Sequence, residues 1–290
     1  MAKKILVTGA SGLIGREFCD QLSKEFEVIG VDNNFRYPNY HPDCTYIKSN
    51  IIEYLESTPN TFDYVFHMGA INGTKYFYEI PNFLLENNIT SDFSVFNFVK
   101  KNPNCKLIYA SSSEIVSDTD IFPTPESTDI FIKNIHNPRW SYRLGKIVAE
   151  NYLINSGINF LIVRFFNIFG RCSAEGHFIG DILKKIEAEN YELIGPDETR
   201  SFCRVDDAVD AVLHIYDKVS NEIINVGSDE EITILQAAQI ISQQKNKDIK
   251  WSLIQGKEGS CKRRKPSLEK LLKYYPGYKP RKFKDAINGF

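Results

Sequence analysis

No stretch of this sequence is long and apolar enough to suggest a membrane span. The most apolar run, residues 158–169, is interrupted by Arg164 and is far shorter than a bilayer-crossing helix. Positive and negative charges nearly cancel, with a formal net charge of −2, which gives no reason to expect nucleic acid or an anionic membrane surface as a partner. A strand begins within the first few residues and leaves no room for a secretory signal, so we expect a cytoplasmic protein.

Cysteine is sparse and follows no recognisable pattern. Its six copies are scattered, form no Cys-x-x-Cys pair and have no histidine at metal-binding spacing. We therefore expect reduced thiols and no metal site. The remaining composition is ordinary, with 42% hydrophobic and 25% charged residues over 290 positions, so the chain has enough apolar material for one large domain or two modest ones.

A glycine-punctuated turn stands at the start of the chain. Residues 5–7 are a short apolar run typical of a buried parallel strand, and a helix with an apolar face is expected over residues 12–26. The glycines between them allow a tight turn whose backbone N–H groups can approach a pyrophosphate at the helix N-terminus. This segment supplies the first predicted cofactor-binding residues: Gly9, Ser11, Gly12, Leu13, Ile14 and Gly15.

An acidic residue ends the next predicted strand, residues 28–31. Asp32 falls where a carboxylate can accept hydrogen bonds from the ribose hydroxyls of a bound adenosine. Strand, turn, helix, second strand and terminal acid occur in the order that a dinucleotide site requires, although a plain strand–turn–helix unit is the alternative. Asp32 would repel a 2′-phosphate and Asn33 and Asn34 follow it, rather than an arginine, so NAD is favoured over NADP.

Strands and helices alternate through the first half of the chain. Further strands are expected at residues 45–48, 64–67, 106–110 and 160–164, and helices at 81–100 and 140–155. This alternation of strands and helices predicts an α/β fold with a Rossmann-type doubly wound parallel sheet. Beyond residue 170 the pattern becomes mixed, with helices near 178–189 and 205–219 and short strands near 223–226 and 250–254. We expect an NAD-binding domain over 1–168, to which segments near 205–227 return, and a smaller mixed α/β substrate-binding portion over 169–290.

Two further segments carry candidate catalytic groups. Tyr142 and Lys146 are four residues apart in a predicted helix, so they share one helical face, and a nearby ammonium favours the phenolate and lowers the pKa of a tyrosine. Tyr142 is thus a candidate general base, although surface pairs of this spacing are common. Ser112 and Glu114 follow the predicted strand at 106–110, where a simple polar turn is the alternative.

These pieces together resemble the extended short-chain dehydrogenase/reductase family, specifically its nucleotide-sugar epimerases and dehydratases. The segment 8–15 is similar to the family's TGxxGxxG fingerprint, and 67–70 to its HxAA segment with Gly69 in place of the usual alanine. Tyr142 and Lys146 match the catalytic pair, and Ser112 matches the family's Ser/Thr. The resemblance also implies cofactor contacts from Asn33, Asn50, Ile51, Met68, Gly69, Ala70, Tyr142 and Lys146.

Three later segments extend the resemblance towards the substrate. Residues 164–171 are similar to RxxNxYGP, residues 199–207 to TRDFxxVDD and residues 262–267 to RRxPD. The resemblance implies that Asn167, Arg200 and Arg264 contact the diphosphate of a nucleotide sugar, with Arg263 nearly as good a match as Arg264. Ser113 is the remaining residue implied to bind substrate. Two arginines that offer bidentate contacts suit a diphosphate.

The resemblance implies oxidation of the sugar at C4, with Tyr142 as base, Ser112 as hydrogen-bond partner and Lys146 holding the ribose and the tyrosine charge. Glu114 stands where dehydratases and decarboxylases place an acid, and the Ser112-Ser113-Glu114 sequence is similar to the decarboxylase pattern. Epimerisation, dehydration or decarboxylation assisted by Glu114 would follow. The alternatives are a net 4-dehydrogenase that releases the keto sugar and a non-catalytic NAD-binding regulator.

The family resemblance also implies a homodimer built from the helices at 81–100 and 140–155. Phe93, Phe96 and Val99 recur at roughly helical spacing, but core packing explains such a stripe more often than an interface does.

Overall fold

The computed structural model describes residues 3–37, 42–170, 177–256 and 260–288. Within these ranges, no helix is both long and apolar enough to cross a membrane. The central element is a parallel sheet of seven strands in the order β11-β6-β5-β4-β1-β2-β3. Its strands are β1 (Lys4–Thr8), β2 (Glu27–Asp32), β3 (Thr45–Lys48), β4 (Tyr64–His67), β5 (Lys106–Ser112), β6 (Phe160–Phe165) and β11 (Glu222–Val226).

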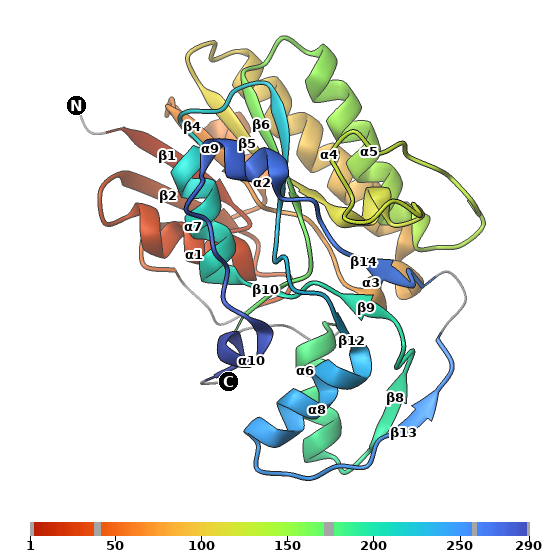
Figure 1. Cartoon of the computed structure of the whole chain (residues 1–290). Helices are drawn as coiled ribbons and strands as arrows, with labels where there is room; N and C mark the ends of the chain where they lie inside the picture. Colours follow the sequence, from red (N-terminus) through yellow and green to blue (C-terminus); the bar gives the residue numbers. More distant parts are fainter. Residues whose placement is uncertain (1–2, 38–41, 171–176, 257–259, 289–290) are drawn as a thin grey trace.

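Helices cover both faces of this sheet, as Figure 1 shows. On one face α1 (Leu13–Leu22) and α7 (Val205–Ile215) pack around Phe18 and Val212, both fully buried. On the other face α2 (Ile51–Ser57), α4 (Pro81–Lys100) and α5 (Trp140–Asn155) enclose Phe96 and Leu153. Because both faces are covered, the inner strands read as continuous apolar runs rather than alternating ones.

The chain order reverses between β1 and β4, which lie side by side in the sheet. From β1 the chain moves outward through β2 and β3, and then in the opposite direction through β4, β5, β6 and β11. Such a switch point opens a crevice at the carboxyl ends of the strands, where ligands bind in doubly wound folds. The glycine turn after β1 lies at this point.

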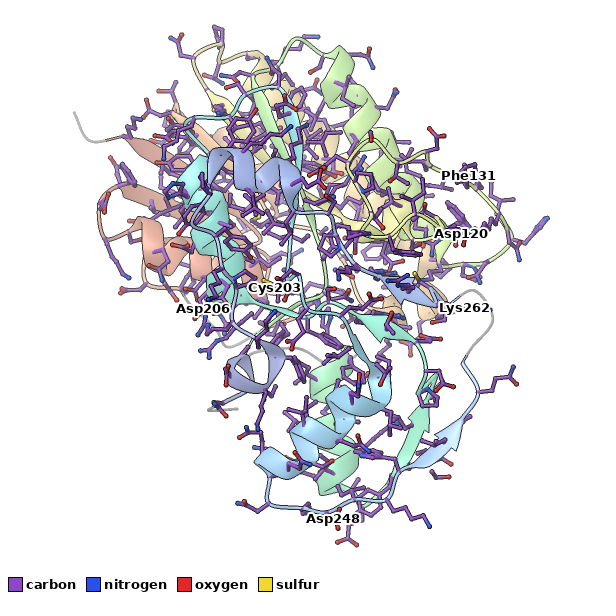
Figure 2. All side chains as sticks on the ribbon, viewed as in Figure 1. Asp120, Phe131, Cys203, Asp206, Asp248 and Lys262 are labelled. Atoms are coloured by element: carbon purple, nitrogen blue, oxygen red, sulfur yellow. The ribbon has the colours of Figure 1, made fainter. Side chains whose placement is uncertain are left out.

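A smaller lobe lies beyond the carboxyl edge of the sheet (Figure 1). It contains α6 (Phe178–Glu187), α8 (Ile234–Gln244) and the paired strands β8 (Glu192–Ile194) and β13 (Ser252–Ile254), around its own apolar core. In Figure 2, Asp248 marks the far tip of this lobe, and Cys203 lies where the lobe meets the sheet-bearing part. The crevice is therefore enclosed from a second side.

Short strands carry the chain between the two parts. The strands β12 (Ile232–Thr233), β9 (Thr199–Arg200) and β14 (Arg263–Arg264) form a small sheet, and β7 (Ile168–Phe169) pairs with β10 (Cys203–Arg204). The remaining helices are α3 (Thr74–Glu79), α9 (Glu269–Tyr274), α10 (Phe283–Ala286) and the 3₁₀ turn at Ser113–Val116.

The predicted elements agree closely with the observed ones. The fold class is confirmed, β3 and β4 have the predicted bounds, and so do α4 and α5. The first helix is shorter than predicted and ends at Leu22, because residues 23–26 form a turn before β2. Phe96 and Val99 are core residues. Arg171 and Cys172 lie outside the described residues, and the five described cysteines are free thiols.

Candidate active site

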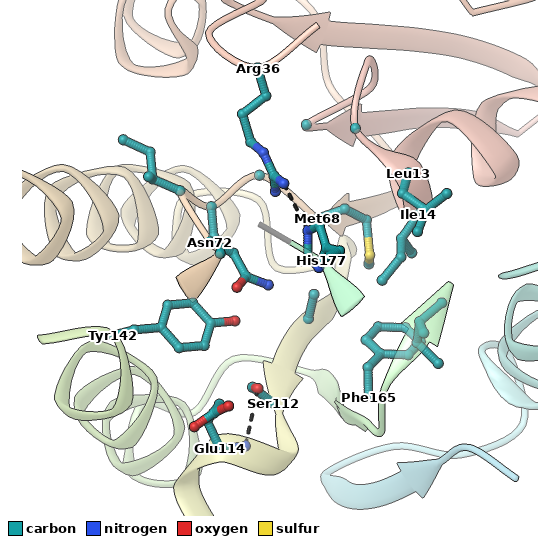
Figure 3. Close-up of a pocket in the computed structure, with 18 of the residues that line it drawn as sticks. Leu13, Ile14, Arg36, Met68, Asn72, Ser112, Glu114, Tyr142, Phe165 and His177 are labelled. Carbon is teal, nitrogen blue, oxygen red and sulfur yellow. Dashed lines mark hydrogen bonds between the residues drawn. The ribbon is translucent and has the colours of Figure 1, made fainter. Parts of the chain in front are cut away.

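A cavity of about 550 Å³ occupies the crevice between the carboxyl edge of the sheet and the smaller lobe. Every residue that the sequence singled out as catalytic, cofactor-binding or substrate-binding lines it. They come from the ends of β1, β2, β4 and β5, from the starts of α1, α2 and α5, and from the segment after β6 and the short strands β9 and β14. Figure 3 shows side chains from several of these segments, among them Leu13, Ser112 and Tyr142, around one space.

The glycine turn is shaped for close approach of a ligand backbone. Gly9 has φ +67°, and a Cβ built on it would lie 2.6 Å from Gly69. A Cβ on Gly15 would lie 2.1 Å from the carbonyl oxygen of Gly9, so larger residues at either position would break the turn. The turn leads into the N-terminus of α1, which favours a bound phosphate.

Asp32 is held in place at the end of β2 by its own surroundings. Its Oδ2 accepts a hydrogen bond from the Ser11 backbone N–H at 3.1 Å, and its Oδ1 accepts one from Asn34 N–H at 2.7 Å. The carboxylate is thereby oriented beside the glycine turn. Asn50, another predicted cofactor contact, caps α2 by accepting a hydrogen bond from the Ile52 N–H at 2.9 Å.

Together the glycine cradle and the fixed carboxylate of Asp32 fit a dinucleotide. These residues would hold the pyrophosphate and the adenosine ribose of NAD, while Lys146 lines the far end of the same cavity.

Tyr142 points into the cavity, with its ring stacked on Phe77 at 5.2 Å between centroids. The Ser112 hydroxyl lies near the Tyr142 side chain and accepts a hydrogen bond from the Glu114 N–H at 3.2 Å. Burial raises the pKa of Tyr142 above its ordinary value, and the Ser112 contact offsets part of that shift. Lys146 does not offset the rest of that shift in this structure.

The reason is the direction that Lys146 takes. Its Nζ donates to the Tyr109 hydroxyl at 2.9 Å and lies 4.4 Å from the centre of that ring, rather than meeting Tyr142. Burial lowers the pKa of Lys146, while the nearby carboxylates of Asp92 and Glu150 act in the opposite direction. The helical spacing of Tyr142 and Lys146 is as predicted, but the hydrogen-bond partner of the lysine is Tyr109 on β5.

Glu114 lies in a cluster of arginines at the floor of the cavity. Its Oε1 is 2.6 Å from Arg139 Nη2 and 3.0 Å from Arg264 Nη1, and its Oε2 is 3.4 Å from Arg143 Nε. Arg143 also pairs with Asp118 at 2.8 Å. Burial alone would raise the pKa of Glu114, but Arg264 and Arg139 outweigh it and hold that pKa well below its usual range. We name Glu114, Arg139, Arg143, Arg264 and Asp118 the arginine cluster.

Pairing between β9 and β14 decides which of two neighbouring arginines faces the cavity. Arg264 is opposite Arg200 in register, and both line the cavity. Arg263 lies on the other side of the strand, where it makes a bidentate contact with Glu231 at 2.7 and 2.9 Å. Because successive side chains of a strand point to opposite faces, Arg264 faces the cavity and Arg263 does not. Arg264 is also the one of the two that the sequence favoured.

Buried hydrogen-bonding atoms in this region remain unpaired. Nε and Nη2 of Arg264 have no partner within the described part of the chain, and neither does Oδ1 of Asn167, a residue with φ 46°. Arg200 pairs with Glu198 at 2.8 Å. Unpaired buried donors carry a free-energy cost, and a cavity-lining arginine such as Arg264 recovers it when an anion binds.

Sequence reasoning gave no role in the site to several residues that the structure places there. Arg139 stands three residues before Tyr142, and this closeness to a predicted catalytic residue could have marked it as part of the site. Arg36 donates from Nη2 to His177 Nε2 at 2.8 Å across the cavity (Figure 3), and burial together with Arg36 lowers the pKa of His177 to about 4. Asp92 is an acidic residue on the apolar face of α4, and a charge in that position could have marked it as a buried functional group.

Comparisons with known proteins agree with this geometry. Residues 5–227 match the model of the NAD dependent epimerase/dehydratase family. A UDP-N-acetyl-alpha-D-glucosaminuronate decarboxylase from Bacillus cytotoxicus is 32% identical over 263 residues, which cover 84% of this chain and 80% of that protein. UDP-glucuronic acid decarboxylase 1 from Xenopus tropicalis is 27% identical, covering 96% of this chain and 68% of that protein.

Solved structures share the fold. The UDP-N-acetylglucosamine 4-epimerase from Methanobrevibacter ruminantium M1 has a TM-score of 0.84 at 26% identity, covering 98% of this chain and 96% of that one. The UDP-glucose 4-epimerase from Thermotoga maritima has a TM-score of 0.87 at 22% identity, with the same coverage of both chains, and so shows likeness of fold. Relatives and structural neighbours include decarboxylases, epimerases and a dehydratase that act on nucleotide sugars. The chain is therefore an enzyme that belongs to the NAD dependent epimerase/dehydratase family.

Proposed function

We propose that this enzyme decarboxylates a UDP-hexuronate through oxidation at C4 of the sugar. The observation that carries the proposal is the arginine cluster. In it the buried Arg143 and Arg264 and the partly buried Arg139 face two carboxylates beside Tyr142. The surplus positive charge and the unpaired donors of Arg264 suit an anionic group on the substrate. The 32% identical decarboxylase from Bacillus cytotoxicus supports the same substrate class.

Tyr142 is the base in this proposal. It removes the proton of the C4 hydroxyl, while Ser112 donates a hydrogen bond to the same oxygen. NAD held by the glycine turn and Asp32 would supply the hydride acceptor for C4 and the reductant for the last step. Lys146 supplies the positive charge that stabilises the phenolate and binds the ribose of the cofactor.

Oxidation at C4 prepares the substrate for loss of carbon dioxide. The new C4 ketone is β to the C6 carboxylate, so the C5–C6 bond breaks with its electron pair delocalised into the ketone as an enolate. A proton from solvent then adds at C5. The C4 ketone would take back a hydride from the reduced cofactor and a proton from the Tyr142 hydroxyl, so that the products are a UDP-pentose and CO₂. Arg139 and Arg264 would hold the carboxylate in place before the bond breaks. The proposal thus gives Arg264 the sugar carboxylate instead of the diphosphate contact that the family resemblance implied.

The surroundings of Glu114 favour this route over proton abstraction at C5. Three guanidinium contacts stabilise the carboxylate and make it a weak base. Epimerisation at C5 or elimination needs a base at that carbon, whereas decarboxylation generates the same enolate without one. In the proposal Glu114 orients the arginines and does not itself transfer a proton.

A product assay tests the proposal. The enzyme and NAD are incubated separately with UDP-glucuronate, UDP-N-acetylglucosaminuronate, UDP-glucose and UDP-N-acetylglucosamine, and the products are followed by ¹H NMR and CO₂ release. We expect CO₂ and a UDP-pentose from a hexuronate, with no turnover of the matched neutral sugars. Epimers of a neutral sugar without CO₂ release from either hexuronate would contradict the proposal, and a released 4-keto sugar with equivalent NADH would indicate a net dehydrogenase.

A further inference from the structure

A continuous line of buried hydrogen bonds joins Lys146 to the glycine cradle. Lys146 Nζ donates to the Tyr109 hydroxyl at 2.9 Å, and that hydroxyl donates to Asp92 Oδ2 at 2.7 Å. On its other oxygen, Asp92 Oδ1 is 2.9 Å from His67 Nε2. His67 Nδ1 is 2.5 Å from the Thr8 hydroxyl.

The far end of the line reaches the cofactor cradle. The Thr8 hydroxyl accepts a hydrogen bond from the Gly69 N–H at 3.2 Å, and Gly69 packs against Gly9 in the glycine turn. We name Lys146, Tyr109, Asp92, His67 and Thr8 the relay. Its residues come from α5, β5, α4, β4 and β1, so it connects five elements at the carboxyl edge of the sheet.

Each hydrogen bond of the relay can be assigned one donor and one acceptor. A carboxylate accepts hydrogen bonds and does not donate, so both His67 Nε2 and the Tyr109 hydroxyl must donate to Asp92. In the neutral form of His67, Nδ1 accepts from the Thr8 hydroxyl, and the Thr8 oxygen accepts from the Gly69 N–H. Tyr109 accepts from Lys146. Each bond thus has one direction, running from the two ends towards Asp92.

Charge balance gives Asp92 a particular importance. Asp92 and Lys146 are both buried, at 1% and 3% exposure. Glu150 also lies near Lys146, but it makes a bidentate contact with Arg164 at 3.0 and 2.7 Å and a hydrogen bond with Ser111. With Glu150 neutralised in this way, Asp92 is the carboxylate that balances the charge of Lys146.

We propose that Asp92 and Tyr109 are positioning residues that hold the Lys146 ammonium, in its charged form, at the catalytic centre. This inference rests on the proposed role of Lys146 in C4 oxidation. An ammonium has three donor hydrogens, and the bond to Tyr109 uses one of them, leaving two for the cofactor ribose and the Tyr142 oxygen. The phenol of Tyr109 separates the two buried charges and fixes the direction of Lys146.

The charges around Lys146 predict the direction in which its pKa changes when the charge of Asp92 is removed. Lys146 is faced by Asp92 on α4, Tyr109 on β5, and Tyr142 and the paired Glu150 on its own helix. Burial lowers the pKa of Lys146 and Asp92 opposes that shift. Removing the Asp92 charge therefore lowers the pKa of Lys146 further, and the lysine loses its proton at a lower pH.

Asp92→Asn is the principal test, because it removes the charge and keeps the shape of the side chain. Tyr109→Phe is the second variant, because it removes one hydroxyl and is the gentler change if Asp92→Asn does not fold. Tyr278→Phe is the matched control: its buried hydroxyl donates to the Gly227 carbonyl at 2.9 Å, outside the cavity. All variants are studied as full-length protein with NAD.

Two measurements are needed. The first follows the ¹⁵Nζ shift of Lys146, assigned with Lys146→Arg, as a function of pH. We expect the midpoint to fall by at least about one pH unit in Asp92→Asn, and to be unchanged in Tyr278→Phe. The second follows kcat and KM for a UDP-hexuronate across pH. We expect kcat of Asp92→Asn and Tyr109→Phe to fall about 10- to 100-fold, with the substrate KM little changed.

The outcomes separate this inference from the proposed function. If wild-type enzyme is active and both variants keep its ¹⁵Nζ titration and kcat profile, the positioning role is refuted. If the titration shifts as expected while wild-type enzyme releases no CO₂ from either hexuronate, the positioning role stands and the decarboxylase proposal fails. A fall in kcat without a shift in the Lys146 titration would also refute the role of the Asp92 charge.

Discussion

Replacing Glu114 with glutamine distinguishes a positioning carboxylate from a catalytic one. The substitution keeps the size of the side chain but removes a buried negative charge that contacts Arg139, Arg143 and Arg264. Three guanidinium groups then face one remaining carboxylate, Asp118. The change therefore alters both the stability of the cluster and the direction of the arginines.

The effect on stability follows from burial. Removing one partner of a buried ion pair costs about 3–5 kcal/mol, and glutamine still accepts hydrogen bonds, so we expect a loss of about 3 kcal/mol near neutral pH. Glu231→Gln is the matched control, because Glu231 pairs with the half-exposed Arg263. Its cost should be below about 1 kcal/mol. Urea denaturation monitored by fluorescence measures both.

The contribution of Glu114 to the free energy of unfolding depends on pH in a definite direction. The pKa of Glu114 is held well below its usual range in the folded protein, so its contribution to stability is present above the unfolded value of about 4.3. That contribution is lost as pH falls through the folded value. The stability difference between wild type and Glu114→Gln should therefore be largest at neutral pH and shrink below about pH 4.

Kinetics give the decisive test of role. If Glu114 orients Arg139 and Arg264, Glu114→Gln should raise KM for the hexuronate about 10-fold or more and lower kcat by a smaller factor. If Glu114 transfers a proton, KM should stay near the wild-type value and CO₂ release should fall about 10²- to 10⁴-fold while bound NADH accumulates. The second result, or a stability loss below about 1 kcal/mol, would refute the reasoning.

Three other changes have definite expected results. Tyr142→Phe should keep NAD binding and reduce the formation of bound NADH from a hexuronate by about 10²- to 10⁴-fold, measured at 340 nm; near-normal rates would exclude Tyr142 as the base. Arg264→Met should raise KM for the hexuronate by about 10- to 100-fold, because charged hydrogen bonds to the substrate are lost. Arg263→Met changes the outer side of the same strand and should leave KM unchanged. Equal effects of the two substitutions on KM would contradict the assignment of Arg264 to the cavity. Asp32→Ala should weaken NAD binding about 10-fold or more in calorimetric titration and narrow the preference over NADP, and an unchanged preference would show that discrimination lies elsewhere.

The predicted homodimer is a separate question for solution measurement. The face of α4 that carries Phe96 and Val99 packs into the core, so those residues are unavailable to a partner. Phe83 on α4 and Val148 on α5 remain exposed, at 52% and 40%. The dimer stays a prediction, which sedimentation equilibrium of wild type and Phe83→Glu would test.

Local patterns predicted most of the fold because their causes are local. An apolar run bounded by turns makes a strand, and the bounds of α4 and α5 follow from their spacing alone. Short elements such as α3 and β9 escaped prediction, because they depend on contacts with distant segments rather than on their own periodicity. In the smaller lobe, α6 and β13 match the helix and strand predicted near 178–189 and 250–254, whereas α8 and β8 were not predicted.

By itself the sequence determined the components of the site that act over a few residues. Gly9 and Gly15 set a turn that larger residues cannot adopt, Asp32 ends the next strand, and a spacing of four puts Tyr142 and Lys146 on one helical face. The identity and order of these groups indicated a dinucleotide enzyme without any three-dimensional information.

Tertiary structure decided how the charges are partnered. Whether Glu114 meets three arginines, whether Lys146 turns to Tyr109, and whether Arg264 rather than Arg263 faces the cavity all depend on segments far apart in the chain. Buried charges have large desolvation costs, so their state is determined by the partner that the fold places beside them. No spacing along the sequence carries that information.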